Sequence, residues 1–430
     1  MAGRRQVSLR GMPEWMTGAE ALLRTLAAQG VEVCFMNPGT SEMQFVAALD
    51  RAPGVRGVLC LDESVAAGAA DGYARAAGKP AAALLHLGPG LANALSNLHN
   101  ARKARSGVVN IVGEHATWHL AYDAPLTADI EAVARPFSDW VAVARTAEET
   151  APRAAEAVAA ARAGQVATLI VPADASWDRC TAAIPAAAPA GEEHEQTEAA
   201  ERAAGDRRRL GGRAGLLLSG RALSEAGLEA AARLHAGTGA RDYANRFAAR
   251  LPRGRGVFPA ARIPYFPEPA EAALAGLELL YTVETQAPVT FFGYPGRPST
   301  LAPAGCRTED LPGAALAPLA RLCGAAAEAY EPEPPQTPED GPLTPDSVGR
   351  TLAALLPAGS LPAAAFPRNC PKRTRLAATA SRVRGSLTTT GRPVPASRQT
   401  APEVSPTVGK RRFTETSAAR ASRQKSSSAR

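Results

Sequence analysis

Short apolar runs separated by alanine-rich stretches fill the first 180 residues of the chain. Their short length and β-prone residues are typical of buried strands in a parallel sheet. Residues 64–77, in contrast, place small side chains at helical spacing and are rich in alanine, the best helix former. The predicted strands are 31–36, 55–61, 81–87, 107–112 and 166–172. Strands that alternate with helices predict an α/β domain at residues 16–180.

A second block with the same alternation comes after a segment rich in Ala, Pro and Glu. An apolar strand at 214–219, a helix at 224–235 and a further strand at 277–283 form a βαβ pattern. We therefore predict two doubly wound, mainly parallel-sheet domains, the second at 211–326. A nucleotide-binding or NAD-dependent dehydrogenase function is disfavoured, because Gly211 and Gly212 precede the strand and no complete G-x-G-x-x-G motif comes after it.

The other segments are assigned by composition. Residues 371–430 hold 14 Lys or Arg against 2 Asp or Glu, with Ser, Thr, Pro and Ala between them. Such a segment cannot bury enough apolar surface to fold, so we predict a disordered basic tail. The net charge of +7 therefore comes from this tail, and the rest of the chain is acidic. The remaining assignments are an N-terminal extension (1–15), a linker (181–210), a Pro-rich linker (327–342), a capped helix that starts a truncated third domain (343–360) and the tail (361–430).

Several classes of protein are disfavoured. The 430 residues include six cysteines and no C-x-x-C pair, which argues against a disulfide framework or a cysteine metal site. No apolar run is long enough to span a membrane, and the Arg-rich first residues lack the apolar core of a secretory signal. A cytoplasmic protein is therefore expected.

Polar side chains come directly after three of the predicted strands. Thr40 lies in a turn after strand 31–36, Glu63 lies where strand 55–61 gives way to a helix, and His86 lies near the end of strand 81–87. In open parallel sheets, ligands bind beyond the carboxyl ends of the strands, which is where these three residues are expected.

Each of these residues also has a simpler interpretation. Glu63 could be a helix cap or a partner of the helix dipole, His86 a satisfied core histidine, and Thr40 an ordinary turn residue. His115 and His119 are four residues apart, which on a helix would suggest zinc, but the region is loop-like and lacks a third ligand nearby. No metal site is predicted.

The sequence from about residue 16 to residue 178 resembles the aminopyrimidine-binding domain of thiamine-diphosphate enzymes. This group includes acetolactate synthase, benzoylformate decarboxylase and related 2-oxoacid decarboxylases. Each matching motif is weak singly, but their order and spacing make the joint match specific. The motifs are Asn37-Pro38-Gly39-Thr40-Ser41-Glu42, Glu63, Ala70-Asp71-Gly72-Tyr73-Ala74-Arg75, Gly78-Lys79-Pro80, Gly88-Pro89-Gly90 with Asn93, and Ile111-Val112-Gly113.

The resemblance implies roles for individual residues. Glu63 matches the glutamate that hydrogen-bonds the cofactor's aminopyrimidine ring and favours its imino tautomer, so that the cofactor can remove its own thiazolium C2 proton. His86 matches a histidine that transfers protons to substrate-derived intermediates. Thr40 matches a hydroxyl residue that faces substrate. His115 lies in a loop near the cofactor domain interface and is assigned, with Thr40, to the substrate. The implied cofactor-binding residues are Asn37, Pro38, Gly39, Gly88, Pro89, Gly90 and Asn93.

The chain departs from the family pattern in its last part. Complete members carry a Gly-Asp-Gly motif and a later asparagine pair that hold Mg²⁺ and the diphosphate, whereas here Gly205-Asp206 runs into Arg207. A truncated or out-of-frame form of a longer enzyme is thus favoured. Weak thiamine-diphosphate binding and little turnover are expected of it.

The resemblance therefore implies an enzyme of the acetolactate synthase type, a transferase, or of the 2-oxoacid decarboxylase type, a lyase. Its cofactor would be thiamine diphosphate, its substrate a small 2-oxoacid, and its assembly a homodimer or homotetramer with the active site between subunits. The alternative is a non-catalytic interaction protein whose basic tail binds nucleic acid or acidic partners.

Overall fold

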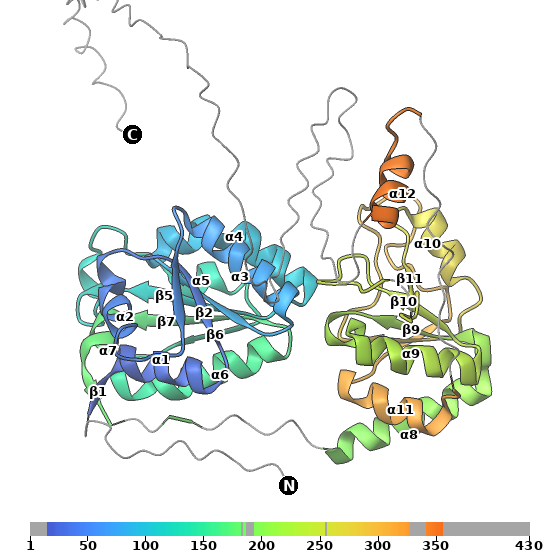
Figure 1. The fold of residues 1–430 in the computed structure, drawn as a ribbon, viewed down its shortest axis with the longest axis horizontal. Helices are drawn as coiled ribbons and strands as arrows, with labels where there is room; N and C mark the ends of the chain where they lie inside the picture. Colours follow the sequence, from blue (N-terminus) through green and yellow to red (C-terminus); the bar gives the residue numbers. More distant parts are fainter. Residues whose placement is uncertain (1–14, 182–183, 186–192, 254–255, 327–340, 356–430) are drawn as a thin grey trace, which may run out of the picture. The chain divides into compact units, whose positions relative to one another are not determined.

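A computed structural model describes residues 15–181, 184–185, 193–253, 256–326 and 341–355. Six parallel strands form the first sheet, in the order β3-β2-β4-β5-β7-β6 (Figure 1). The short strands β1 (Met16–Thr17) and β8 (Arg179–Cys180) pair antiparallel in a sheet of their own. The strands of the first sheet are β2 (Val33–Asn37), β3 (Arg56–Leu59), β4 (Ala81–Leu85), β5 (Val108–Glu114), β6 (Trp140–Val143) and β7 (Val166–Pro172).

Helices cover both faces of this sheet because its central strands are apolar on both sides. On β4, Ala82 and Leu84 pack into one buried cluster and Ala81, Ala83 and Leu85 into the other, as the period of two requires. Helices α1 (Gly18–Ala28), α2 (Met43–Ala48) and α6 (Ala147–Arg162) contribute to the first cluster. Helices α3 (Glu63–Ala77), α4 (Leu87–Ala104) and α5 (Ile130–Ala134) contribute to the second. The short α7 (Ala173–Trp177) comes directly after β7.

A second parallel sheet has the order β11-β10-β9-β12-β13 (Figure 1). Its strands are β9 (Ala214–Leu218), β10 (Arg241–Ala244), β11 (Ala261–Arg262), β12 (Leu279–Val283) and β13 (Arg307–Asp310). Helices α8 (Glu193–Leu210), α9 (Glu225–Thr238) and α11 (Leu316–Cys323) bury one face, and α10 (Pro267–Leu274) packs on the other. The predicted α/β class with two mainly parallel sheets is confirmed.

The prediction of a linker at 181–210 is wrong for part of this segment. Residues 193–210 form helix α8, which buries four alanines against the second sheet, namely Ala199, Ala200, Ala203 and Ala204. The many Glu and Arg residues of this segment give it the mean hydropathy of a linker. Alanine pairs at helical spacing were the signal for a buried face.

The end of β4 also differs from the prediction. The predicted strand at 81–87 stops at Leu85, and the predicted turn Gly88-Pro89-Gly90 is instead the first turn of α4. Proline is tolerated there because the first N–H groups of a helix have no partner within it. Leu87 enters the helix with a φ of 49°, in the left-handed region that residues other than glycine rarely adopt.

The predicted helix at the start of 343–360 is present as α12 (Pro345–Leu355), with Ser347 N–H bonded to Thr344 Oγ1 at 3.1 Å. The N-terminal extension except Trp15, most of the Pro-rich linker and the tail at 361–430 lie outside the described residues. Among the described helices, none combines the length and apolar character that crossing a membrane requires. Cys34 and Cys60 are buried free thiols.

Candidate functional site

The strand order brings the predicted polar residues to one edge of the first sheet. Strand β2 lies between β3 and β4, with Met36 beside Leu59 and Asn37 beside Leu85. Since all three strands are parallel, the segments after them emerge at the same edge. These segments carry Thr40, Glu63 and His86, as the sequence predicted.

Glu63 is the first residue of α3, and it does not cap that helix. Asp62 is the N-cap, and its Oδ1 accepts a hydrogen bond of 2.7 Å from the N–H of Ser64. The simpler interpretation of Glu63 as a cap is therefore wrong, because Asp62 caps the helix. Glu63 is only 7% exposed, although glutamate side chains are mostly exposed in proteins.

Helix α4 holds the Glu63 side chain. Asn93 donates from Nδ2 to Glu63 Oε2 over 3.1 Å. A Cβ on Gly90 would lie 2.9 Å from Glu63 Oε1 and 3.3 Å from Cγ, so the glycine gives the carboxylate its space. The structure thus brings Glu63, Gly90 and Asn93 together, three residues selected from the sequence.

A second contact joins His86 to Glu42. His86 is the N-cap residue of α4, and its Nδ1 lies 2.7 Å from Oε2 of Glu42, which also accepts a hydrogen bond of 2.8 Å from the N–H of Gly39. Glu42 is 3% exposed and ends the 3₁₀ helix η1 (Thr40–Glu42). A Cβ on Gly39 would lie 2.3 Å from the His86 ring, so a larger residue would displace the imidazole.

Sequence reasoning missed Glu42 as a site residue, although it stood inside the first motif. The available signal was its position three residues after Gly39, where a glutamate reaches back to the N–H of the cap residue. That signal predicts a local cap, whereas the bond to His86, 44 residues further on, depends on the pairing of β2 and β4.

A further buried carboxylate, Glu114, ends β5. Its Oε1 accepts a hydrogen bond of 2.8 Å from the N–H of His115. Burial raises the pKa of Glu114, and the charge of Glu42 adds to that rise. The ring of His115 has a different partner, with Nε2 3.0 Å from the carbonyl oxygen of Pro125.

The other predicted residues lie around these contacts without forming part of them. Thr40 and Pro89 are exposed, while Asn37 and Pro38 are half-buried. Gly88 is buried against Ala128: a Cβ on Gly88 would lie 2.5 Å from the Cβ of Ala128.

The loop after β5 contains a pair of neighbouring histidines. His115 and His119 lie ring to ring, with centroids 5.7 Å apart. No group of three His, Cys, Asp or Glu that could hold a metal occurs in the described part of the chain.

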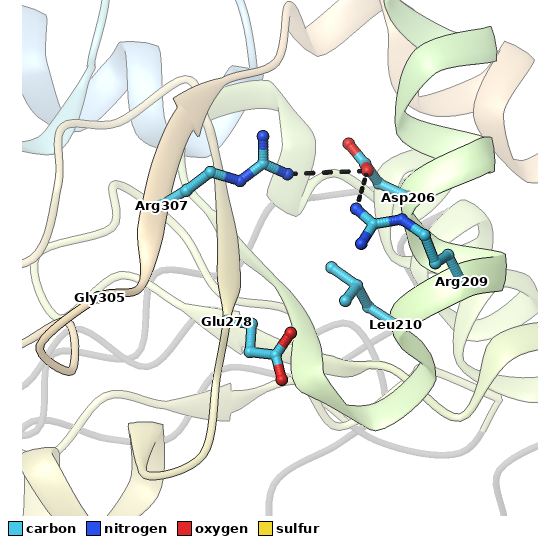
Figure 2. Close-up of a pocket in the computed structure, with 6 residues that line it drawn as sticks. All are labelled: Asp206, Arg209, Leu210, Glu278, Gly305 and Arg307. Carbon is cyan, nitrogen blue, oxygen red and sulfur yellow. Dashed lines mark hydrogen bonds and ion pairs between the residues drawn. The ribbon is translucent and has the colours of Figure 1, made fainter.

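A pocket of about 450 Å³ lies elsewhere, in the second α/β unit (Figure 2). It opens near the amino ends of β12 and β13, opposite the edge where parallel sheets bind ligands. Its charges already pair with each other, since Asp206 bonds Arg209 at 2.6 Å and lies 3.7 Å from Arg307. It is lined by Asp206, Arg209, Leu210, Glu278, Gly305 and Arg307. The strand tips of the first sheet therefore remain the better candidate.

Comparison with known proteins identifies the family of the chain. Residues 16–135 match the family model described as "Thiamine pyrophosphate enzyme, N-terminal TPP binding domain". The chain is 48% identical over 353 residues to the "Putative acetolactate synthase large subunit IlvX" of Mycobacterium tuberculosis, a match that covers 80% of this chain and 67% of that relative. The chain belongs to the thiamine pyrophosphate enzyme family.

Solved structures place the same family fold on most of the chain. A "putative thiamin diphosphate-dependent enzyme" from Mycobacterium smegmatis superposes with a TM-score of 0.60 at 24% identity, over 80% of this chain and 71% of that one. The thiamine diphosphate-dependent 4-hydroxybenzoylformate decarboxylase of Rhodococcus jostii RHA1 gives a TM-score of 0.58 at 20% identity, over 76% and 66%. At these identities the likeness concerns the fold.

Proposed function

We propose that the chain is a thiamine-diphosphate-dependent enzyme of the acetolactate synthase or 2-oxoacid decarboxylase type, in which Glu63 activates the cofactor. The observation that carries the proposal is a buried carboxylate at the strand tips, held by Asn93 and given space by Gly90. A glutamate sheltered from water keeps its hydrogen bonds strong, and recognition of a ring nitrogen depends on that strength.

The residues present fit one half of the cofactor. The carboxylate of Glu63 is an acceptor that suits a protonated aminopyrimidine nitrogen, and its second oxygen lies close to the glycine backbone of α4. Thiamine diphosphate, when bound, supplies the thiazolium carbon that adds to the carbonyl of a 2-oxoacid. Around Glu63, the residues proposed to bind the cofactor are Asn37, Pro38, Gly39, Gly88, Pro89, Gly90 and Asn93.

The described residues do not fit a magnesium ion. They contain no cluster of three or more His, Cys, Asp or Glu side chains that could hold a metal. We therefore assign no magnesium ligand and no step to a metal.

The side chains of this edge have separate tasks in the proposal. Glu63 holds the pyrimidine ring and favours one protonation state of it. His86 exchanges a proton with the bound 2-oxoacid through its imidazole ring, and Thr40 and His115 line the substrate side. The burial of Glu63 keeps water away from its carboxylate. A homodimer or homotetramer with the site between subunits completes the proposal.

Titration of the full chain with thiamine diphosphate tests the assignment of Glu63. We expect weak binding in which saturation-transfer NMR reports contacts to the aminopyrimidine protons. Glu63→Gln should weaken this binding about tenfold or more, because a charge-assisted hydrogen bond is lost. Glu131→Gln, in the first turn of α5, is the matched control and should change nothing.

Each of two outcomes would contradict one of these expectations. Equal affinity of the wild type and Glu63→Gln would reject the role of Glu63. Tight, Mg²⁺-dependent binding in a calorimeter would contradict the weak binding expected of this chain. Circular dichroism spectra of both variants establish that the comparison is made between folded proteins.

A further inference from the structure

Glu42 has no role in the function proposed above, yet it is among the most buried carboxylates of the described residues. It is 3% exposed, and burying a carboxylate is costly unless hydrogen bonds offset the lost hydration. Its Oε2 meets two groups, the N–H of Gly39 at 2.8 Å and Nδ1 of His86 at 2.7 Å. Glu42 is therefore the side chain that determines the hydrogen bonding of Nδ1.

The backbone makes room for this pair on two sides. Gly39 leaves space for the His86 ring, whose atoms lie 2.3 to 2.5 Å from the place of a Cβ. Gly113, on β5, leaves space for Glu42, whose Oε1 lies 1.7 Å from the place of a Cβ. Neither glycine has a φ in the left-handed region, so close approach explains both of them. Three neighbouring strands, β2, β4 and β5, thus carry the contact.

The second oxygen of Glu42 is buried without a partner among the described residues. Beside it lies a cavity of about 20 Å³ whose lining includes Ser41, Glu42, Gly113 and Ser176. That volume suits a single water molecule, and two hydroxyl groups and a carboxylate are the partners such a molecule needs.

From these contacts we propose that Glu42 is the positioning residue of His86: it fixes the imidazole with the proton on Nδ1, so that Nε2 is the acceptor offered to the substrate. A carboxylate accepts but cannot donate, so the nitrogen facing it must carry the proton. A histidine that exchanges protons needs one defined tautomer, and the partner of its other nitrogen sets that tautomer. This inference deepens the proposed function and rests on it.

The tautomer can be measured directly in the full chain without cofactor. Long-range ¹⁵N–¹H spectra of histidine-labelled protein show which ring nitrogen carries the proton, and His86→Asn identifies the resonances of this residue among the six histidines. We expect the Nδ1–H form for neutral His86 in the wild type. The Nε2–H form in the wild type would overturn the proposal without any variant of Glu42.

Two substitutions then separate a positioning role from a general effect of burial. Glu42→Gln should shift the tautomer ratio about tenfold toward Nε2–H, because a charge-assisted hydrogen bond is replaced by a neutral one. Glu114→Gln, which removes the neighbouring buried carboxylate and leaves the bond between Glu42 and His86 in place, should leave the ratio unchanged. An unchanged ratio in Glu42→Gln, or an equal shift in Glu114→Gln, would contradict the proposal.

The surrounding charges are the same in all of these comparisons except at the substituted residue. Glu42 lies near enough to Glu114 on β5 to raise the pKa of that carboxyl, and His115 comes next in the chain. Because no cofactor is present, failure of this test leaves the assignment of Glu63 intact. Conversely, loss of the Glu63 assignment leaves the tautomer measurement valid.

Discussion

At the residue scale, the candidate site depends on places where a side chain is absent. Gly39, Gly90 and Gly113 each face a functional group at a distance that no Cβ could occupy without displacing it, namely His86, Glu63 and Glu42. These glycines come from three different segments of the chain. The site is therefore specified by the space around its acids as much as by the acids themselves.

Two helical glycines give a matched test of this argument. Gly72, on α3, has nothing within 4 Å of its Cβ position, whereas Gly90, on α4, faces Glu63 at 2.9 Å. Gly72→Ala should raise the free energy of unfolding by about 0.5 to 1 kcal/mol, because alanine costs less backbone entropy. Gly90→Ala should lack that gain and should weaken thiamine diphosphate binding several-fold.

Denaturant unfolding and calorimetric titration of the two variants provide the measurements. Gly72→Ala should bind the cofactor as the wild type does. If Gly90→Ala bound it equally well, the carboxylate of Glu63 would not depend on the space beside α4, and the description of the site would be wrong.

At the scale of elements, a fully buried ion pair links helix α8 to the second sheet. Arg207 on α8 reaches Oδ1 of Asp242 on β10 at 3.3 Å, and both side chains are inaccessible to solvent. Burial raises the pKa of Asp242 to about 6, and the guanidinium of Arg207 opposes this rise. A buried pair is weak evidence of stability, because desolvation offsets much of its attraction.

This raised pKa has a measurable consequence. The native carboxyl keeps its proton up to a pH of about 6, whereas the unfolded chain releases it near 3.8, so the fold takes up a proton between these values. The contribution of Asp242 to stability is complete below pH 3.8 and is lost as the pH rises through 6. Asp242→Asn should lack this dependence.

Unfolding free energies of the wild type and Asp242→Asn at several pH values provide the test. The free energy of unfolding of the wild type minus that of Asp242→Asn should fall by roughly 2 to 3 kcal/mol as the pH rises from about 4 to about 6.5. Asp206→Asn, which changes a partly exposed carboxyl on the same helix as Arg207, is the control. A constant difference across this range would show that Asp242 stays charged in the native protein.

At the scale of the whole molecule, basic and acidic side chains are distributed unevenly along the sequence. The described α/β units belong to an acidic part of the chain, and residues 371–430 hold 14 basic and 2 acidic side chains. All residues of the candidate site lie within the first sheet and its connecting segments. We therefore expect the function proposed for that site to be independent of residues 371–430.

Removal of residues 371–430 tests this partition. We expect thiamine diphosphate affinity and the unfolding transition to stay the same within error, because no site residue is removed. A loss of cofactor binding would contradict the partition. Salt-dependent binding of a DNA fragment, present in the full chain and lost on truncation, would instead support the alternative function in which the basic segment recruits nucleic acid.

Local sequence signals were sufficient for elements whose partners are close in the chain. The strand before Glu63, the helix after it and the α/β class could be derived from apolar runs and alanine spacing. Helix α8 was missed because its buried face consists mainly of alanines, with one arginine and a single leucine, which composition does not distinguish from a linker. The end of β4 was misplaced because the left-handed φ of Leu87 has no sequence signal.

The sequence by itself determined the identity of the strand-end residues, Glu63 and His86 among them, because parallel strands bring their carboxyl ends, and the residues beyond those ends, to one edge of the sheet. Only the tertiary structure decided which acid meets which partner. Glu63 meets Asn93 through the packing of α3 on α4, and Glu42 meets His86 through the register of β2 and β4. Such contacts depend on atoms brought together from distant segments, and their distances are set by strand register and helix packing.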